Sequence, residues 1–199
     1  MKFIRRLLWF LANRLMILLL LLAVITVVFY LSFNTTNIYI LVKDGLYQRA
    51  NVILRAQDDT NEVNALRNFF RQEFLDGDDA LRIGLSEQSP YRDYRIVTFD
   101  HNVSLDSIRS LPWETRAEVV VTERIPRMEG RVIADRASLV ADGTLTEYPP
   151  TWRGGQYRIT LIRQAGRWRI SRMEQLRAII EPTPSPKPTA ETTATPAPN

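Results

Sequence analysis

The first part of the chain is a continuous apolar stretch. Residues 15–33 are LMILLLLLAVITVVFYLSF, and no residue from Leu15 to Val42 carries a formal charge. A helix of nineteen residues is roughly 28 Å long, which matches the hydrocarbon thickness of a bilayer. The pattern predicts a transmembrane helix over residues 15–35, preceded by a short leader over residues 1–14.

A cleaved signal peptide is the alternative to a membrane anchor. Signal peptides have a shorter apolar core, followed by small residues at the cleavage site. Here the core is longer, and bulky residues such as Phe29, Tyr30 and Phe33 stand where small ones are needed. The pattern favours an uncleaved anchor. Four basic residues precede the span, and flanking basic residues favour the cytoplasm, so we expect residues 34–199 to lie outside it.

Beyond the span, the apolar positions first recur at helical spacing. Asp44 is expected to cap a helix whose apolar face comprises Leu46, Ala50, Ile53 and Leu54. A second helix is predicted from apolar positions at 63, 66, 69, 70 and 74. The acidic run at residues 76–79 should end it, and a short third helix is expected over residues 80–85.

After Pro90 the pattern changes to that of strands. Residues 94–99 and 117–122 are rich in β-branched and aromatic side chains, and residues 131–141 form a weaker candidate. Residues 156–163 and 167–172 alternate around Ala165-Gly166, which predicts a two-residue hairpin. In that hairpin Leu161 should lie opposite Ile170 on the core side, and Thr160 opposite Ser171 on the other side.

Helices followed by an antiparallel meander predict an α+β fold over residues 37–181, with N-terminal helices packed on an antiparallel sheet. The final hairpin has the form Y-x-I-x-L followed by G-x-W-x-I, from Tyr157 to Ile170. With helices before it, this hairpin resembles that of the nuclear-transport-factor-like superfamily, over about residues 46–176. The resemblance implies a curved antiparallel sheet wrapped around the N-terminal helices, which forms a cone-shaped domain with a pocket. It also implies a role either in protein contacts within bacterial envelope assemblies or as a small-molecule isomerase or cyclase.

Composition and charge narrow the possible functions. The chain has no cysteine and one histidine, which excludes disulfides, thiolate metal sites and multi-histidine metal centres. No cofactor motif occurs, so none is predicted. The net charge of +4 equals the charge of the four basic residues in the leader, and the rest of the chain is neutral. A nucleic-acid-binding domain would carry its excess positive charge on the fold, so nucleic acid is not an expected partner.

Few residues are candidates for catalysis. An isomerase or cyclase of the ketosteroid isomerase or polyketide cyclase type would need a carboxylate or histidine inside the cone, and the candidates are Asp93, Asp100 and His101. His101 is expected to face solvent at a strand end, and adjacent strand residues point to opposite faces. The acidic run at residues 76–79 resembles a fragment of a calcium loop, but the spacing of an EF-hand is missing. No catalytic residue is assigned.

Two tryptophans and the hairpin arginines are candidates for partner binding. Trp152, between two prolines and a flexible diglycine, either folds into the core or is exposed as an anchor for a partner, and Trp113 poses the same choice. Arg158 and Arg169 belong to a basic ribbon along the hairpin. The ribbon is either a solvated face balanced by acidic residues or a contact for an anionic partner, such as lipid headgroups or wall polymer.

The end of the chain, residues 182–199, contains six of the eleven prolines and no bulky apolar residue. Such a segment cannot bury enough surface to fold, so a disordered tail is predicted. Together the patterns favour a non-catalytic, membrane-anchored extracytoplasmic binding or assembly module, an accessory subunit of an envelope complex with a protein partner at the membrane surface. The alternative is a membrane-anchored isomerase or lyase acting on an apolar small molecule.

Overall fold

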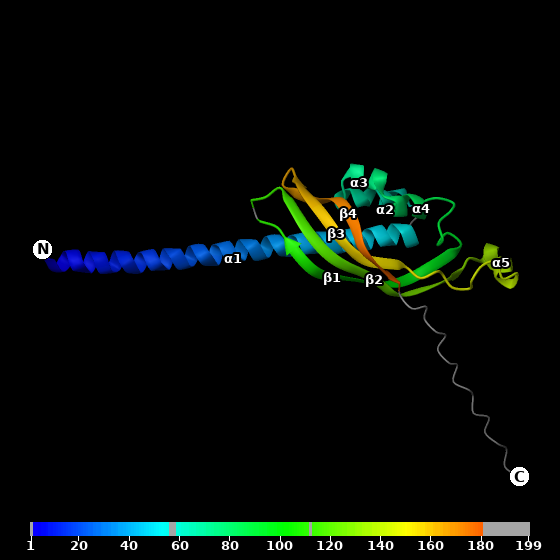
Figure 1. Ribbon diagram of the computed structural model, residues 1–199, viewed down its shortest axis with the longest axis horizontal. Helices are drawn as coiled ribbons and strands as arrows, with labels where there is room; N and C mark the ends of the chain where they lie inside the picture. The colour runs from blue at the N-terminus through cyan, green and yellow to red at the C-terminus, as the bar shows by residue number, and fades with distance from the viewer. Residues whose placement is uncertain (1, 56–58, 112, 181–199) are drawn as a thin grey trace, which may run out of the picture.

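The computed structural model describes residues 2–55, 59–111 and 113–180, so the predicted tail lies outside the described residues. A single helix, α1 (Lys2–Leu54), contains both the apolar span and the first helix of the domain (Figure 1). The predicted helix start at Asp44 is therefore wrong. An N-cap residue leaves the helical conformation, and Asp44 lies within an unbroken helix with its side chain exposed.

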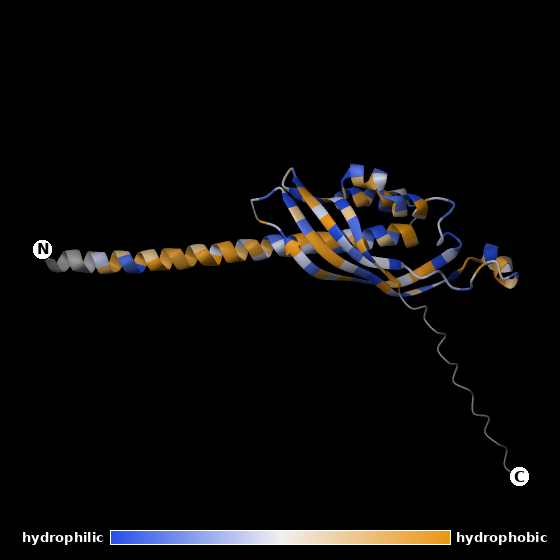
Figure 2. Ribbon diagram, viewed as in Figure 1, coloured by the Kyte–Doolittle hydropathy of each residue, from blue (hydrophilic) through white to orange (hydrophobic). Residues whose placement is uncertain are grey.

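The two parts of α1 have different surroundings. Between Trp9 and Phe33 its apolar side chains are exposed, and by length and composition this is the one described helix that could cross a membrane. From Ile38 onward one face of α1 is buried against the sheet, and Val42, Leu46 and Ala50 are fully enclosed. Figure 2 shows the apolar helix leading directly into the domain. The protein thus has one candidate membrane helix, which is also the core helix of its domain.

Short helices follow where one longer helix was predicted. They are α2 (Thr60–Ala65), the 3-10 helix η1 (Leu66–Asn68), α3 (Gln72–Gly77) and α4 (Asp79–Gly84). The helical path breaks at Phe70 because the backbone there pairs with strand β4: Ile170 N donates to Phe69 O at 2.8 Å, and Arg71 N donates to Ile170 O at 2.9 Å. Tertiary pairing thus overrides the helical spacing of the phenylalanines. The predicted stop at Gly77 and the short helix after it are confirmed.

Four antiparallel strands form one curved sheet in the order β1-β2-β3-β4, so the fold is α+β (Figure 1). The strands are β1 (Tyr94–Arg109), β2 (Arg116–Val132), β3 (Arg153–Gln164) and β4 (Arg167–Ile180). The strand predicted at 131–141 is wrong beyond Val132. There the chain forms the 3-10 helix η2 (Ala134–Arg136) and α5 (Ala137–Ala141), in a segment rich in alanine, the best helix former.

The hairpin of β3 and β4 forms around Ala165-Gly166, both with positive φ, as two-residue turns require. Leu161 lies opposite Ile170, and both are fully buried, as predicted. Thr160, however, lies opposite Arg172 and not Ser171, because a register shift separates Thr160 from Leu161. Ser171 Oγ instead donates a hydrogen bond to Thr160 O at 3.0 Å. The extra residue is a β-bulge, which bends the strand around the core.

Candidate functional site

Two ionisable side chains meet beneath the sheet. His101 Nε2 lies 2.9 Å from Glu123 Oε1, and the side chains are 2% and 0% exposed. The expectation that His101 faces solvent is therefore wrong. The reason is a register shift between Ile96 and Thr98, after which Phe99 and His101 take inward positions of β1 and Asp100 stays exposed. A second register shift lies between Asp100 and Asn102, opposite Pro126 of β2, which has no N–H to donate to the ladder.

Aromatic rings enclose this pair. Tyr47 of α1 meets the His101 ring edge-on, with centroids 5.7 Å apart, and Phe99 does so at 6.5 Å. Glu123 Oε2 is buried and has no hydrogen-bond partner among the described residues. A buried carboxylate oxygen without a partner costs free energy. His101 and Glu123 thus form a polar pair among aromatic side chains, and Glu123 Oε2 remains as an acceptor without a hydrogen bond to any residue that the structure describes.

A second buried pair lies nearby. Arg49 of α1 donates two hydrogen bonds to Asp78, Nε to Oδ2 at 2.6 Å and Nη2 to Oδ1 at 2.9 Å, and both side chains are 5% exposed. Asp78 Oδ1 also accepts from Ala80 N and Leu81 N at the start of α4. Burial alone would raise the pKa of Asp78, but the hydrogen bonds and charge of Arg49 outweigh it and lower this pKa below 3.8. The pair therefore stays ionised and ties α4 to α1.

Tyr157 of β3 is electrostatically coupled to both pairs. Burial, followed by the negative charge of Glu123, raises the pKa of Tyr157 to about 12, and Arg49 and Asp78 also act on it. We call His101, Glu123, Tyr157, Arg49 and Asp78 the buried polar cluster. These five residues come from helix α1, the start of α4 and three strands. The cluster therefore exists only in the folded domain.

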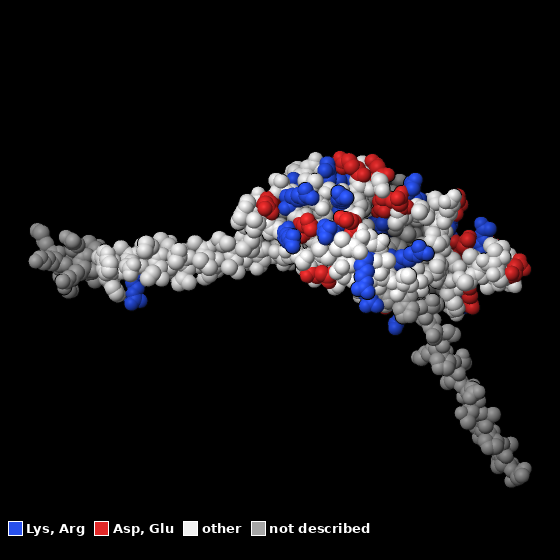
Figure 3. All heavy atoms as spheres, in the orientation of Figure 1, with Lys and Arg blue, Asp and Glu red and all other residues white. Residues whose placement is uncertain are grey.

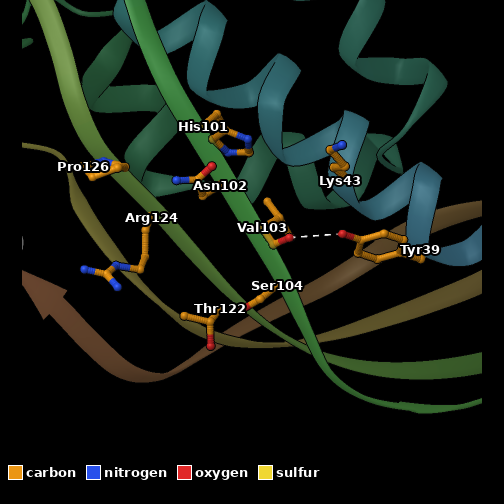
Figure 4. A pocket seen from close by; sticks show the side chains of 9 residues that line it. All are labelled: Tyr39, Lys43, His101, Asn102, Val103, Ser104, Thr122, Arg124 and Pro126. Atoms are coloured by element: carbon orange, nitrogen blue, oxygen red, sulfur yellow. Dashed lines mark hydrogen bonds between the residues drawn. The ribbon is translucent and has the colours of Figure 1, made fainter.

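An open hollow of about 460 Å³ adjoins the cluster, between α1 and strands β1 and β2. His101, Lys43, Tyr39 and Arg124 are among its lining residues, as Figure 4 shows. Tyr39 donates a hydrogen bond to Val103 O at 3.1 Å, which fastens α1 to β1 at the edge of the hollow. A histidine beside such an opening can exchange a proton with a ligand. No group of three or more His, Asp and Glu side chains in the described part of the chain could hold a metal ion.

The two tryptophans predicted as partner anchors lie in different surroundings. Trp152 is 6% exposed and packs near Tyr91, with ring centroids 6.2 Å apart, which corresponds to the core alternative. The diglycine after it is part of β3 and not a flexible loop. A side chain at Gly154 would meet Glu123 O at 2.5 Å. Trp113 is 74% exposed, in the loop between β1 and β2.

The hairpin arginines do not form one uniform basic face. Arg158 pairs with Glu118 at 3.2 Å and with Glu174 at 3.6 Å, while Arg169 is partly exposed opposite Ile162. Over much of the domain, basic and acidic side chains are interspersed (Figure 3). This distribution favours the solvated-face alternative for Arg158.

The other acidic candidates lie outside the buried polar cluster. Asp93 pairs with Arg136 at 3.2 Å, and Asp100 is exposed, so neither lies in the buried polar cluster. Within the acidic run, Asp76 accepts a hydrogen bond from Gln72, and Asp79 pairs with Arg82.

Sequence reasoning missed Glu123 and Arg49, although both leave a signal. On β2 the inward positions Ala117, Val119, Val121 and Ile125 are apolar, and Glu123 interrupts this alternation. Arg49 lies three residues after Leu46 on the buried face of α1. A charged residue at a core position in either pattern indicates a buried partner.

No family model, no curated protein and no solved structure matches this chain. The resemblance to the nuclear-transport-factor-like superfamily therefore stays a prediction based on the hairpin and the element order.

Proposed function

We propose that the protein is a non-catalytic, single-pass membrane-anchored binding module, an accessory subunit of an envelope complex. Its domain lies outside the cytoplasm and contacts a protein partner at the end away from the bilayer. The orientation follows from Lys2, Arg5, Arg6 and Arg14, which precede the span and favour the cytoplasmic side. The proposed cone-like fold, by resemblance, accords with such a role.

The observation that carries this proposal is that residues 133–151, which we call the distal excursion, project from the domain and are held in place by hydrogen bonds. It is pinned to the sheet at both ends: Ile133 N donates to Asp93 O at 3.0 Å, and the Tyr94 hydroxyl lies 2.9 Å from Thr146 Oγ1. In Figure 1 the excursion, with α5, projects from the domain at the end opposite the span. An ordered loop on a rigid scaffold is a common position for binding residues.

The distal excursion has an aromatic side chain suited to a protein contact. Tyr148 is 60% exposed, although the segment that carries it is held in place. Tyrosine contributes strongly to interfaces because it combines a large apolar ring with a hydroxyl group and loses little conformational entropy. Anchoring in the membrane confines the search for a partner to the surface, so a modest interface is sufficient.

Site-specific photo-crosslinking in intact membranes tests the proposal. A photoreactive phenylalanine derivative is placed at Tyr148 and, as the matched control, at Arg172, which is exposed on the sheet. We expect a discrete protein adduct from position 148 and none from position 172. Equal adducts from both positions, or none from position 148, would contradict the proposal.

A separate experiment tests the orientation. The chain has no cysteine, so Asp142→Cys gives a single thiol on the distal excursion. We expect a membrane-impermeant maleimide to label this thiol in intact cells. Labelling only after lysis would place the domain in the cytoplasm and refute the extracytoplasmic assignment.

A second candidate function is supported by the pair of His101 and Glu123 beside the hollow. A histidine held by a carboxylate next to an opening can move a proton to or from a ligand. This keeps open a membrane-anchored isomerase or lyase acting on an apolar small molecule. The test is turnover of a β,γ-unsaturated ketosteroid by proteoliposomes. The enzymatic alternative requires turnover that is lost in His101→Gln while the domain stays folded, and it is rejected if no turnover occurs.

A further inference from the structure

The end of the domain next to the span presents exposed apolar and basic side chains. Two connections meet there, the loop between β1 and β2 and the turn between β3 and β4. Asn34, directly after the apolar run of residues 15–33, is bonded beside both: its Nδ2 donates to Ser110 Oγ at 2.9 Å, and its Oδ1 accepts from Nε1 of Trp168, at the start of β4, at 3.4 Å. Both connections therefore lie at the level where the span ends.

We call this end of the domain the bilayer-facing rim, and its defining residues are Arg109, Leu111, Trp113, Arg116, Arg163 and Arg167. Trp113 is 74% exposed and Leu111 41% exposed. Arg109, Arg116 and Arg167 are also exposed, and Arg163 lies over the Trp168 ring at 5.8 Å. The rim loop also contains one acidic residue, Glu114, whose carboxylate accepts the N–H of Leu111 at 3.3 Å. The rim thus combines exposed apolar side chains with an excess of positive charge.

We propose that the bilayer-facing rim binds anionic phospholipid headgroups of the leaflet in which the span ends. Trp113 and Leu111 enter the interfacial region, where tryptophan is favoured because its ring is apolar and its N–H is polar. The guanidinium groups of Arg109, Arg116 and Arg167 bind lipid phosphates, for which their planar donor geometry is well suited.

The continuity of α1 favours lipid over a protein as the occupant of the rim. No loop separates the span from the domain, because α1 is unbroken from Lys2 to Leu54. Asn34 follows Phe33, the last residue of the apolar run, and it is bonded to the rim itself. An exposed tryptophan at this level reaches the headgroup layer of the bilayer that α1 crosses. The rim lies at this level in either orientation of the protein.

Spin-label accessibility in nanodiscs tests the proposal with the full chain. Since the protein has no cysteine, Glu114→Cys places one label in the rim and leaves Trp113 intact, while Asp142→Cys places the control label on the distal excursion and leaves Tyr148 intact. Collision with a neutral aqueous nickel chelate is measured in discs of phosphatidylcholine alone and in discs with one third phosphatidylglycerol. Comparing the same label in both lipids removes the shielding that the protein itself provides.

We expect the chelate to reach the rim label much less in anionic discs than in neutral ones, with no difference at the control label. Each basic residue near an anionic surface favours docking about fivefold, so Arg109→Gln, Arg116→Gln and Arg167→Gln together should weaken it up to about 100-fold. Trp113→Ala in the same background should also expose the label. Circular dichroism and thermal unfolding verify that each variant is folded.

Two results would overturn the proposal. One is a rim label as accessible as the control label in both lipids, which would mean that the rim is in water. The other is protection that does not depend on the anionic lipid or on the three arginines, which would mean that the headgroup phosphates are not bound. Since the distal excursion is untouched by these variants, failure here leaves the proposed protein-binding function standing.

Discussion

The two halves of α1, the apolar span and the part within the domain, lie in different surroundings. In the span half, side chains are apolar all around the helix, and Leu20, for example, is 68% exposed. In the domain half, a buried stripe at Ile38, Val42 and Leu46 faces the sheet, while Lys43 and Asp44 face outward. The first half is specified by composition and the second by periodicity.

A helix can thus change its surroundings without a break in its backbone. The polar groups on the domain half also differ in kind from those on the span half. Thr26 donates only to its own helix, at Leu22 O, whereas Arg49 pairs with Asp78 across the core. The domain half is therefore stabilised by specific tertiary partners, and the following changes measure how much it depends on them.

The largest effect is expected for Asp78→Ala. It leaves the Arg49 guanidinium buried without its partner and removes the N-cap of α4, so we expect a loss of about 3–5 kcal/mol in the free energy of unfolding. Denaturant unfolding in detergent, followed by tryptophan fluorescence, measures it. Asp79→Ala is the matched control, since Asp79 and Arg82 are both largely exposed and the change should cost less than about 1 kcal/mol. Equal losses in both variants would refute a special role for the buried pair.

Leu46→Ala against Leu20→Ala compares the two halves directly. Leu46 is fully buried, and its truncation should cost about 2–5 kcal/mol of domain stability. Leu20 lies in the span, and its truncation should leave domain unfolding unchanged within error. If the two variants lost the same stability in the same denaturant experiment, the boundary between the halves would be misplaced.

The stability of the domain should fall at both extremes of pH. The pKa of Asp78 is lowered in the folded state, so its contribution is present above about pH 4 and is lost as the pH falls below it. Burial raises the pKa of Tyr157 to about 12, so its contribution is present below about pH 10 and is lost as the pH rises toward 12. Denaturant midpoints across the pH range measure both. Burial also raises the pKa of Tyr91 to about 12, so Tyr157→Phe should flatten part of the alkaline limb. An unchanged limb would contradict the assignment.

The smallest effect is expected for Tyr39→Phe. This change removes the hydrogen bond to Val103 O and should cost about 0.5–1.5 kcal/mol. Tyr30→Phe, in the exposed half, is the control and should have no effect on domain unfolding. A larger loss from Tyr30→Phe than from Tyr39→Phe would reverse the expected order.

Local patterns in the sequence predicted the span, the α+β class and the hairpin pair of Leu161 and Ile170. They failed where contacts distant in sequence decide. Phe70 leaves its helix because it pairs with Ile170, and His101 is buried beside Glu123 because a register shift between β1 and β2 turns it inward. The continuity of α1 was missed because Asp44 is a good capping residue. A residue that can cap a helix does not by itself start a new one. Here the existing helix continues through Asp44 because its next turn, at Leu46, is buried.

In the proposed membrane-anchored arrangement, the absence of a hinge in α1 sets the height of the domain above the bilayer. From Asn34 to Leu54 the helix rises about 30 Å, and the distal excursion with α5 lies beyond that end of α1 in Figure 1, so it is held farther than this from the end of the span. The domain keeps lateral diffusion and rotation about the membrane normal, and it lacks the freedom of a tethered bead. A partner whose contact surface lies at this height would bind without the entropy cost of ordering a flexible linker. A partner whose contact surface lies at another height would not reach the domain. Under the proposed function, α1 would therefore set a distance as well as anchor the domain.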